Sequence, residues 1–571
     1  MLVRAGLFLL ALLVAQPVFA QTPVSEIPRA VPVAARNGMV AAQEARAARI
    51  GNDVLKAGGN AVDAAVATGF ALAVTYPRAG NIGGGGFMVI HLARGKRNIA
   101  IDYRETAPAA TTRDIFLDDK GEADPQKSRD SGLAIGVPGT VAGLVLAHQR
   151  YGSRRFTLAQ LMAPAINLAR DGIPVDADMA ANLPDAQSRV WRWPASTRIF
   201  FKDGKPLGIG DTFIQTDLAA SLEAIARGGE RAFYQGPIAE KIVTAVAAAG
   251  GKMTLDDLKN YRAIERAPVR GTYRGHEIIS MPPPSSGGLH LVQMLNILEG
   301  YRLRRSGPDS ADSLHVLIEA MKRAYADRAV FLGDPAFAQI PAKGLVSKRY
   351  AAQLRAGIDP KAATPAKDVR AGNPAAHEGD NTTHYSIVDR YGNAVANTYT
   401  LNLNYGVGLV ADGTGILLNN ELDDFAAKPG APNAFGLVGG DANAPGPGKR
   451  PLSSMTPTIV IKKGRPFLIT GSPGGSRIIT TVLQVIVNAA DHRMNIADAV
   501  SAPRVHHQWL PDEVVVEPGL PAATLQALEA RGHKIAPRPP GTAANSIMMK
   551  RDVLIGAADP RTARGALAVG Y

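Results

Sequence analysis

Residues Thr382 to Thr400 read TTHYSIVDRYGNAVANTYT, and this stretch decides the fold of the chain. It predicts a strand from Thr383 to Asp389, a turn at Arg390 to Asn393, and a returning strand from Ala394 to Thr400. The result is a β-hairpin that begins abruptly, directly after a segment of very different composition.

That preceding segment runs for 26 residues, from Ala356 to Asn381, and its large apolar side chains are Ile358 and Val369 alone. A stretch of this length without structure of its own is uncommon inside a compact domain. We therefore expect it to be a linker or a functional loop.

Thr382, the residue where this segment meets the hairpin, is of a type that can cleave the chain at its own peptide bond. Its hydroxyl would attack the carbonyl of Asn381 and form an ester, which water would then open. The freed α-amine titrates near ~7.7–8.0 and so could serve as the base for its own hydroxyl. On spacing alone, the plainer interpretation of Thr382 as a β-branched strand residue is favoured.

The other elements indicate a mixed α/β protein. A helix is predicted from Ala41 onward, and Asn60 with Asp63 marks the start of a second one. More helices fill the first two-thirds of the chain, and further hairpins are predicted from Thr458 to Thr470 and from Ser546 to Ala557. This order predicts sheets layered against helices.

Composition excludes several classes of protein. The 571 residues carry a net charge of +13, 46% of them are hydrophobic, and none is cysteine. Disulfides, thiolate metal sites and a cysteine nucleophile are therefore excluded. The basic residues are scattered without interleaved aromatic residues, so we expect no nucleic-acid partner.

Residues 1–20 are predicted to be a cleaved signal peptide. Arg4 is followed by an apolar run from Gly6 to Ala15, and the segment ends at the small residue Ala20. A membrane anchor is the alternative, but the run is shorter than the ~20 residues that span a bilayer. We expect a periplasmic or secreted protein without stable membrane insertion.

Two glycine-rich runs and a pair of adjacent histidines are further candidate sites. Gly83 to Gly86 lack the lysine of a phosphate-binding loop and favour close backbone packing. Gly471 to Ser476 lie between a strand and a helix, where backbone amides can converge on an oxyanion. His506 and His507 would point to opposite faces of a strand, so we expect no metal and no cofactor.

The chain resembles the γ-glutamyltranspeptidases, which are N-terminal nucleophile hydrolases, over nearly its whole mature length. The resemblance rests on six segments in one order: Asp102–Pro108, Thr382–Ser386, Thr398–Asn402, Asn419–Phe425, Arg450–Met455 and Gly471–Arg477. It implies an α/β (α+β) fold, a four-layer αββα sandwich formed by two fragments. Residues 21–381 would be the large subunit and 382–571 the small, catalytic subunit of a heterodimer.

The resemblance also implies the catalytic residues. Thr382 would be the nucleophile, freed by cleavage between Asn381 and Thr382. Thr400 would hydrogen-bond its hydroxyl, and the amides of Gly474 and Gly475 would hold the oxyanion. The reaction would pass a γ-glutamyl group from glutathione or a related donor to water or to an amino acid or peptide acceptor.

The residues that would grip the α-amino acid end of the donor have opposite charges. For its carboxylate the resemblance implies Arg104, Ser453 and Ser454, and for its ammonium Asn402, Glu421 and Asp424. A zwitterion requires this division, because a guanidinium fork binds a carboxylate and acids bind an ammonium.

Two positions depart from many bacterial members of the family. Glu421 stands where they have Gln, and Phe435 stands where they have Tyr, in a stretch from Pro429 to Pro447 that resembles the family's lid loop. An ionised Glu421 can add attraction for the ammonium. Loss of the tyrosine hydroxyl leaves the balance between hydrolysis and transfer open.

Two alternatives stay open. A related glutaryl or cephalosporin acylase would share the fold and the nucleophile, but a glutaryl group has no α-amine for Glu421 and Asp424 to bind. An exported, unprocessed amino-acid-binding protein would have the fold without the chemistry.

Overall fold

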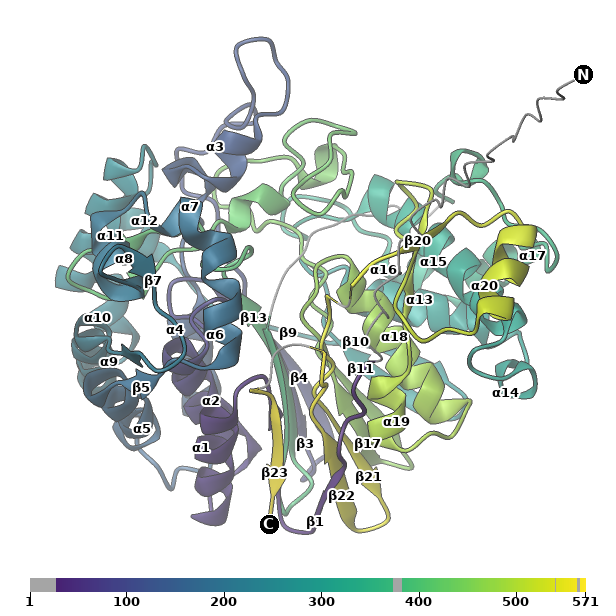
Figure 1. The fold of residues 1–571 in the computed structure, drawn as a ribbon, viewed down its shortest axis with the longest axis horizontal. Coiled ribbons are helices and arrows are strands. Elements are labelled where there is room, and N and C mark those ends of the chain that lie inside the picture. Colours follow the sequence, from purple (N-terminus) through teal and green to yellow (C-terminus); the bar gives the residue numbers. More distant parts are fainter. Residues whose placement is uncertain (1–26, 373–382, 540, 562–564) are drawn as a thin grey trace, which may run out of the picture.

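Two seven-stranded antiparallel sheets face each other in the computed structural model, which describes residues 27–372, 383–539, 541–561 and 565–571 (Figure 1). Sheet A has the order β1 (Val33–Ala35), β22 (Val553–Ala557), β21 (Ser546–Lys550), β17 (Arg465–Thr470), β16 (Thr458–Lys462), β11 (His276–Ser280), β10 (Val269–Tyr273). Sheet B has the order β23 (Leu567–Gly570), β2 (Met39–Ala42), β12 (Thr383–Val388), β13 (Ala394–Thr400), β3 (Gly85–Leu92), β4 (Arg97–Tyr103), β9 (Ile264–Arg266).

Helices cover the outer face of each sheet. The helices that contact sheet B are α1 (Ala45–Lys56), α2 (Ala61–Thr75) and α4 (Thr140–Tyr151), and α5 (Leu158–Asp171), α9 (Thr216–Gly228) and α11 (Pro237–Ala248) lie in the same hydrophobic cluster. The helices that contact sheet A are α13 (Gly287–Leu298), α18 (Arg477–Ala490) and α19 (Ile496–Ser501), and α15 (Ala311–Phe331), α17 (Lys348–Ala356) and α20 (Ala522–Ala530) lie in the same hydrophobic cluster. The predicted four-layer αββα sandwich is confirmed.

Short elements complete the described part of the chain. The helices are α3 (Pro125–Arg129), α6 (Ala177–Asn182), α7 (Gln187–Val190), α8 (Pro194–Phe200), α10 (Glu230–Tyr234), α12 (Leu255–Asn260), α14 (Leu303–Ser306), α16 (Ala342–Leu345). The strands are β5 (Ile173–Pro174), β6 (Phe201–Lys202), β7 (Lys205–Pro206), β8 (Thr212–Phe213), β14 (Val410–Ala411), β15 (Ile416–Leu417), β18 (Val505–His506), β19 (Val514–Val516), β20 (Ile535–Pro537).

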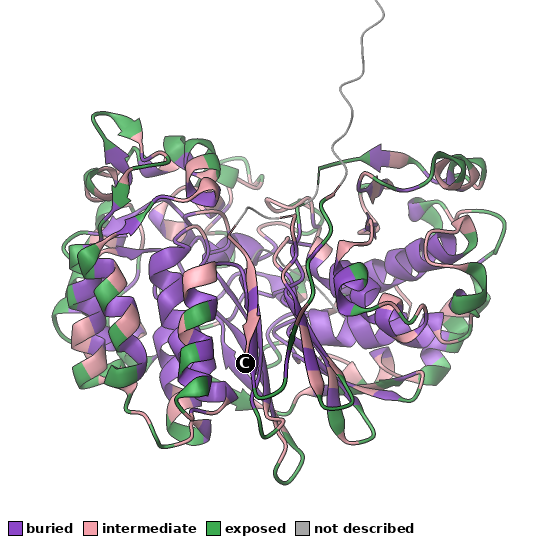
Figure 2. Cartoon of the chain, turned by 60° about the horizontal axis from the view of Figure 1, so that its bottom comes forward, coloured by how far each residue is buried: buried purple, intermediate pink, exposed green. Residues whose placement is uncertain are grey.

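The core between the sheets is made of apolar side chains from both inner faces. Phe87 and Val89 of β3 lie in one cluster with Ile459 of β16 and Ile469 of β17, all fully buried. Figure 2 shows buried strands and inner helix faces, with exposed residues on the outer helix faces and loops. The two sheets therefore form one rigid centre.

The predicted hairpin is confirmed as β12 and β13, with Thr383 opposite Tyr399 and Val388 opposite Ala394. Asp389 holds its turn by accepting hydrogen bonds from the amides of Tyr391 (2.8 Å) and Asn393 (3.0 Å). Every strand of the hairpin is buried because β2 pairs with β12 and β3 pairs with β13. The stretch after position 382 thus forms the middle of sheet B.

The predicted start of α2 is confirmed, but the predicted start of the helix before it, α1, is not. Asn60 and Asp63 form the predicted capping box of α2. The helix expected from Ala41 begins instead at Ala45, capped by Glu44, and Met39–Ala42 form β2. The expectation of helix at Ala41 was wrong because β2 pairs with both β12 and β23, partners that are remote in sequence.

Of the segment expected to be a linker or loop, residues 356–372 are described, and Ala356 is the last residue of α17. They contain one 3-10 turn, Ala366–Asp368, and pack Ile358 and Val369 into the protein. The remainder of the segment lies outside the described residues.

Candidate active site

Polar residues from both sheets meet at the edge opposite the hairpin turns. β4 ends at Tyr103, next to Arg104, and β13 ends at Thr400, opposite Gly85 of β3. In sheet A, β17 ends at Thr470, before the glycine-rich run, and lies beside Thr458, where β16 begins. The predicted segments Asp102–Pro108, Thr398–Asn402 and Gly471–Arg477 therefore lie at the ends of strands on one side of the sandwich.

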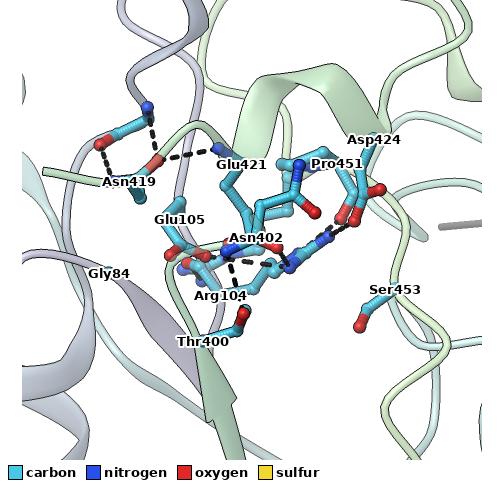
Figure 3. Close-up of polar contacts among 12 residues, drawn as sticks. Gly84, Arg104, Glu105, Thr400, Asn402, Asn419, Glu421, Asp424, Pro451 and Ser453 are labelled. Carbon is cyan, nitrogen blue, oxygen red and sulfur yellow. Dashed lines mark hydrogen bonds and ion pairs between the residues drawn. The ribbon is translucent and has the colours of Figure 1, made fainter. Parts of the chain in front are cut away.

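Arg104 is the centre of a fully buried charged cluster, which we call the Arg104 cluster: Arg104, Glu105, Glu421, Asp424. Its guanidinium contacts Glu421 through Nη1 and Asp424 through Nη2, and Glu105 lies 4.0 Å from Nη1 (Figure 3). Nε donates to the Pro451 carbonyl at 2.9 Å. The structure thus brings together the predicted carboxylate-binding arginine and two of the predicted ammonium-binding residues.

The cluster holds more acids than its single cation can neutralise. Burial raises the pKa of Glu421 well above its ordinary value, although Arg104 opposes this, and Glu105 and Asp424 add to it. Burial also raises the pKa of Glu105 to about 8. Both oxygens of Glu105 and Oε2 of Glu421 have no hydrogen-bond partner among the described residues. The cluster therefore favours an added proton or another cation.

The backbone around Arg104 is held by charged residues that face away from the cluster. Asp102 accepts a hydrogen bond from the Arg104 amide (2.9 Å) and pairs with Arg266 at 2.7 Å. Arg450 donates to the Arg104 carbonyl at 2.5 Å. Asp102 thus has a structural role, and the Arg104 side chain is left to Glu421 and Asp424.

Thr400 and Asn402 lie beside the cluster. The Thr400 hydroxyl accepts a hydrogen bond from the Asn402 amide at 2.8 Å, and Asn402 has a positive φ of 72°. Asn402 Nδ2 donates to the Asn420 carbonyl (2.9 Å), while its Oδ1 has no partner among the described residues. Asn402 therefore presents an unused acceptor next to Thr400.

The run Gly83 to Gly86 lets backbones approach closely at this edge. A Cβ on Gly84 would lie 2.0 Å from the Thr400 carbonyl, and one on Gly85 would lie 2.6 Å from Glu105 Oε2. The close backbone packing predicted for this run is confirmed.

Ser453 and Ser454 lie in the loop whose Leu452 carbonyl accepts a hydrogen bond from Arg104 Nη2 at 3.3 Å. Their hydroxyls do not contact Arg104: Ser453 Oγ accepts from the Met455 amide (3.1 Å), and Ser454 Oγ contacts Arg328. Arg328, a buried residue of α15, was not predicted as a site residue. In the sequence it follows Leu317, Met321 and Ala324 at the spacing of one helix face, and this is the signal that could have identified it, although α15 is buried on every side from Ser313 to Arg328.

Gly474 and Gly475 precede α18 in left-handed conformations, with φ of 126° and 63°. Neither amide donates a hydrogen bond to another described residue. A Cβ on Gly474 would lie 2.3 Å from Thr542 Cγ2, so a larger residue would shift this turn. Two neighbouring amides that donate to no other described residue are thus available just before a helix, a place where backbone amides can bind an anionic oxygen.

The lid-like loop is fastened through its backbone. Ala434 N donates to Asp423 Oδ2 (3.0 Å), and the Phe435 carbonyl accepts from Gln508 Nε2 (3.1 Å). Gln508 Oε1 in turn accepts from Ser476 Oγ at 2.6 Å. A side-chain bridge from Gln508 thus holds the loop against α18 without a tyrosine hydroxyl.

Several predictions fall outside the described residues: the signal peptide 1–20, and Asn381 with Thr382. The first described residue of the hairpin, Thr383, is buried, and its hydroxyl has no partner among the described residues. Within the described ranges, every helix is too short or too polar to cross a bilayer, and no three His, Asp or Glu side chains are grouped to hold a metal ion.

Comparison with known proteins places the chain among relatives of nearly equal length. A model of the family Gamma-glutamyltranspeptidase matches residues 47–569. The glutathione hydrolase proenzyme of Escherichia coli is 54% identical over 542 residues, which cover 95% of this chain and 93% of that protein.

Acylases are also similar. The acylase ACY 1 proenzyme of a Pseudomonas species is 40% identical over 515 residues, 89% of each chain. The crystal structure of cephalosporin acylase from Bacillus halodurans superposes with a TM-score of 0.85 at 29% identity, covering 98% of this chain and 99% of that one. The family match and the 54% identity confirm the resemblance found in the six segments: this chain is an enzyme of the γ-glutamyltranspeptidase family, an N-terminal nucleophile hydrolase.

Proposed function

We propose that this chain is an exported enzyme that cleaves itself before Thr382 and then cleaves the γ-glutamyl amide of glutathione and related donors. The observation that carries the proposal is the Arg104 cluster, where one buried arginine meets three acids beside Thr400. Such a cluster suits the α-amino acid end of a γ-glutamyl group, which carries one negative and one positive charge.

Donor binding would redistribute the contacts of the cluster. The α-carboxylate of the donor would bind Arg104, together with the hydroxyls of Ser453 and Ser454. Its ammonium would bind Glu421, Asp424 and Oδ1 of Asn402, which accepts no hydrogen bond from the described residues. Because the donor's carboxylate would take Arg104 as its partner, its ammonium would give the acids a cation of their own, and the net charge of the cluster would not change.

The chemical step would use Thr382 as nucleophile. Its hydroxyl attacks the γ-carbonyl carbon while its α-amine takes the hydroxyl proton, and Thr400 orients the hydroxyl. The Gly474 and Gly475 amides stabilise the oxyanion. The C–N bond breaks, the α-amine passes the proton to the departing amine, and a γ-glutamyl ester of Thr382 remains. Water or an acceptor amine then opens the ester.

Cleavage between Asn381 and Thr382 would give a large subunit, 21–381, and a small subunit, 382–571. We expect the two to stay together as a heterodimer. The first strands of the small piece, β12 and β13, lie between β2 and β3 of the large piece in sheet B. Separation would break backbone hydrogen bonds on both sides of the hairpin and expose its buried residues.

The test is processing of the wild-type protein and of Thr382→Ala. At 60.0 kDa for 571 residues, cleavage should give pieces of about 38 and 20 kDa, the smaller beginning Thr-Thr-His-Tyr. Thr382→Ala should stay uncut and inactive. A single band from active wild-type protein would contradict the proposal, and a single band from inactive protein would favour the amino-acid-binding protein.

Likeness to two acylases makes glutaryl amide cleavage the second candidate. A glutaryl group has no ammonium, so it would leave the excess acids of the Arg104 cluster unbalanced. We expect γ-glutamyl-p-nitroanilide to be cleaved at least roughly a hundredfold faster than glutaryl-p-nitroanilide, because charge-assisted contacts contribute about 1.5–3 kcal/mol each. Equal rates on the two anilides would favour the acylase.

A further inference from the structure

The hairpin turns at the end of the sandwich opposite the candidate active site are rich in basic residues. Five turns, taken with the strand residues at their ends, meet around one cavity at the lower end of the sheets in Figure 1: 36–38 (β1–β2), 93–97 (β3–β4), 389–393 (β12–β13), 462–465 (β16–β17) and 550–552 (β21–β22). Ten of these 20 residues are Lys or Arg and two are Asp, whereas the whole chain has 63 Lys and Arg in 571 residues. The fold therefore gathers at one end basic residues that are scattered along the sequence.

We call the lysines and arginines of these five turns the basic end, and their charges face outward. All ten are exposed. Within the described part of the chain one of them forms an ion pair, Arg465 with Asp552 at 2.9 Å, and the two side chains are 62% and 79% exposed, so the pair is weak. The other acid, Asp389, is buried and accepts hydrogen bonds from the amides of Tyr391 and Asn393 in its own turn. The basic end thus keeps a large excess of positive charge.

Three of these cations occupy backbone positions that do not favour them. Lys96, Lys463 and Arg551 have positive φ angles of 50°, 52° and 56°. Glycine and asparagine adopt this conformation at lower cost than lysine or arginine does. The geometry of the turns therefore does not explain these side chains, whereas a need for positive charge at this end of the molecule does.

The cavity among the five turns has a volume of about 380 Å³. Four of the turns each contribute one cation to its wall: Arg36, Lys96, Arg390, Arg465. Lys96 reaches from sheet B to the β16–β17 turn of sheet A, because a Cβ on Gly464 would lie 3.2 Å from its Nζ. Cationic side chains from both sheets thus surround a space in which a phosphate group can bind.

The number and spread of the cations favour an extended anionic surface over one small ion. A single phosphate in the cavity would leave the cations outside its wall, such as Arg94 and Lys463, without a partner. Tyr391 is the one aromatic residue in the five turns, so they lack the series of rings on which bases stack when proteins bind single-stranded nucleic acid. Anionic phospholipid headgroups present many phosphates side by side and attract clusters of lysine and arginine.

We propose that the basic end binds the surface of a membrane that carries anionic phospholipids, with one headgroup phosphate in the cavity. The inference goes beyond the proposed function and does not depend on it. Arg104 and the glycine-rich run before α18 follow the opposite ends of the strands. The bound protein would therefore keep its candidate active site facing away from the membrane.

The experiment measures sedimentation of the purified wild-type protein with vesicles of mixed phosphatidylglycerol and phosphatidylcholine, and with vesicles of phosphatidylcholine alone. We expect binding to the anionic vesicles only. It should weaken at least roughly tenfold between about 0.01 M and 1 M salt, because the Debye length falls from about 30 Å to about 3 Å.

Lys463→Gly combined with Arg551→Gly removes two charges at positions whose φ angles suit glycine. We expect this variant to bind anionic vesicles at least roughly tenfold more weakly, while its midpoint of urea unfolding stays close to that of the wild type. Lys96→Gln combined with Arg390→Gln tests the cavity in the same way and decides the question if the glycine variant does not fold.

Arg304→Gln combined with Arg305→Gln is the matched control. It removes two exposed cations of α14, outside the basic end. Because the change in net charge equals that of the other two variants, it separates the position of the charges from their number. Binding to anionic vesicles should change by less than about twofold.

Three results would overturn the inference. The first is wild-type protein that binds neither kind of vesicle, or both equally. The second is a control variant that weakens binding as much as the basic-end variants do, since net charge alone would then explain it. The third is tighter binding to a DNA duplex than to anionic vesicles at equal phosphate concentration, which would favour a nucleic-acid partner instead.

Discussion

Two buried arginine clusters of this enzyme differ in their balance of charge. The Arg504 cluster consists of Arg504, Glu517, Asp559 and Arg561, with two cations and two acids. Arg504 pairs with Asp559 at 2.5 Å, and Arg561 pairs with Asp559 at 3.1 Å and with Glu517 at 2.9 Å. The Arg104 cluster, at the other extreme, has one cation and three acids.

The two clusters differ in the pKa values and the hydrogen bonds of their acidic side chains. Burial alone would raise the pKa of Asp559, but Arg504 and Arg561 lower it below its ordinary value, and the Ala544 amide donates to Oδ2 at 2.8 Å. In the Arg104 cluster, equal burial raises the pKa of Glu105 and Glu421, and three of their four carboxylate oxygens have no hydrogen-bond partner among the described residues. A balanced, satisfied cluster stabilises a fold, whereas an unbalanced one suits a charged ligand.

The largest effect is expected from Asp559→Asn, which leaves two buried arginines with one acid. Breaking a buried ion pair by removing one partner costs about 3–5 kcal/mol. Urea unfolding of the processed enzyme should show this loss in the free energy of unfolding. Asp552→Asn, which removes the exposed partner of Arg465, is the control and should change it by less than about 0.5 kcal/mol.

Glu421→Gln completes the comparison, because it removes an acid from the cluster that has too many. We expect a change in the free energy of unfolding within about 1 kcal/mol. A loss as large as that of Asp559→Asn would contradict the distinction between the two clusters.

Arg104→Lys should have the next largest effect, and on donor binding instead of stability. Lysine keeps the charge but loses the planar fork that binds a carboxylate at two points. We expect the KM for γ-glutamyl-p-nitroanilide to rise roughly tenfold to a hundredfold, equivalent to about 1.4–2.8 kcal/mol, with a smaller change in kcat. An unchanged KM would show that Arg104 does not bind the donor.

Much of the fold could be predicted from sequence because its signals are local. The capping box at Asn60 and the hairpin that ends at Thr400 depend on neighbouring residues. β2 and β23 could not be predicted, since each is four residues long and exists through pairing with strands remote in sequence.

The residues of the site also separate into those that could be predicted from local sequence and those that could not. Its motif residues could be named from the six segments, and the structure brings Arg104, Glu421 and Asp424 together. The contact of Arg328 with Ser454 spans 126 residues, and that of Gln508 with Phe435 spans 73. Nothing in either local sequence specifies the partner, so such contacts require the folded chain.

The smallest expected effect concerns Glu105, whose pKa is raised by burial from an ordinary 4.5 to about 8. The folded enzyme therefore holds this proton more tightly than the unfolded chain does. The resulting stability is complete below about pH 4.5 and is lost as the pH rises through about 8.

Between pH 7 and pH 8 the loss of the Glu105 proton should lower the free energy of unfolding by about 1 kcal/mol. Glu105→Gln, which keeps the shape without the charge, should remove that decline in urea unfolding at the two pH values. If the variant and the wild type decline equally, Glu105 does not carry the excess proton, and the imbalance of the Arg104 cluster must rest on Glu421.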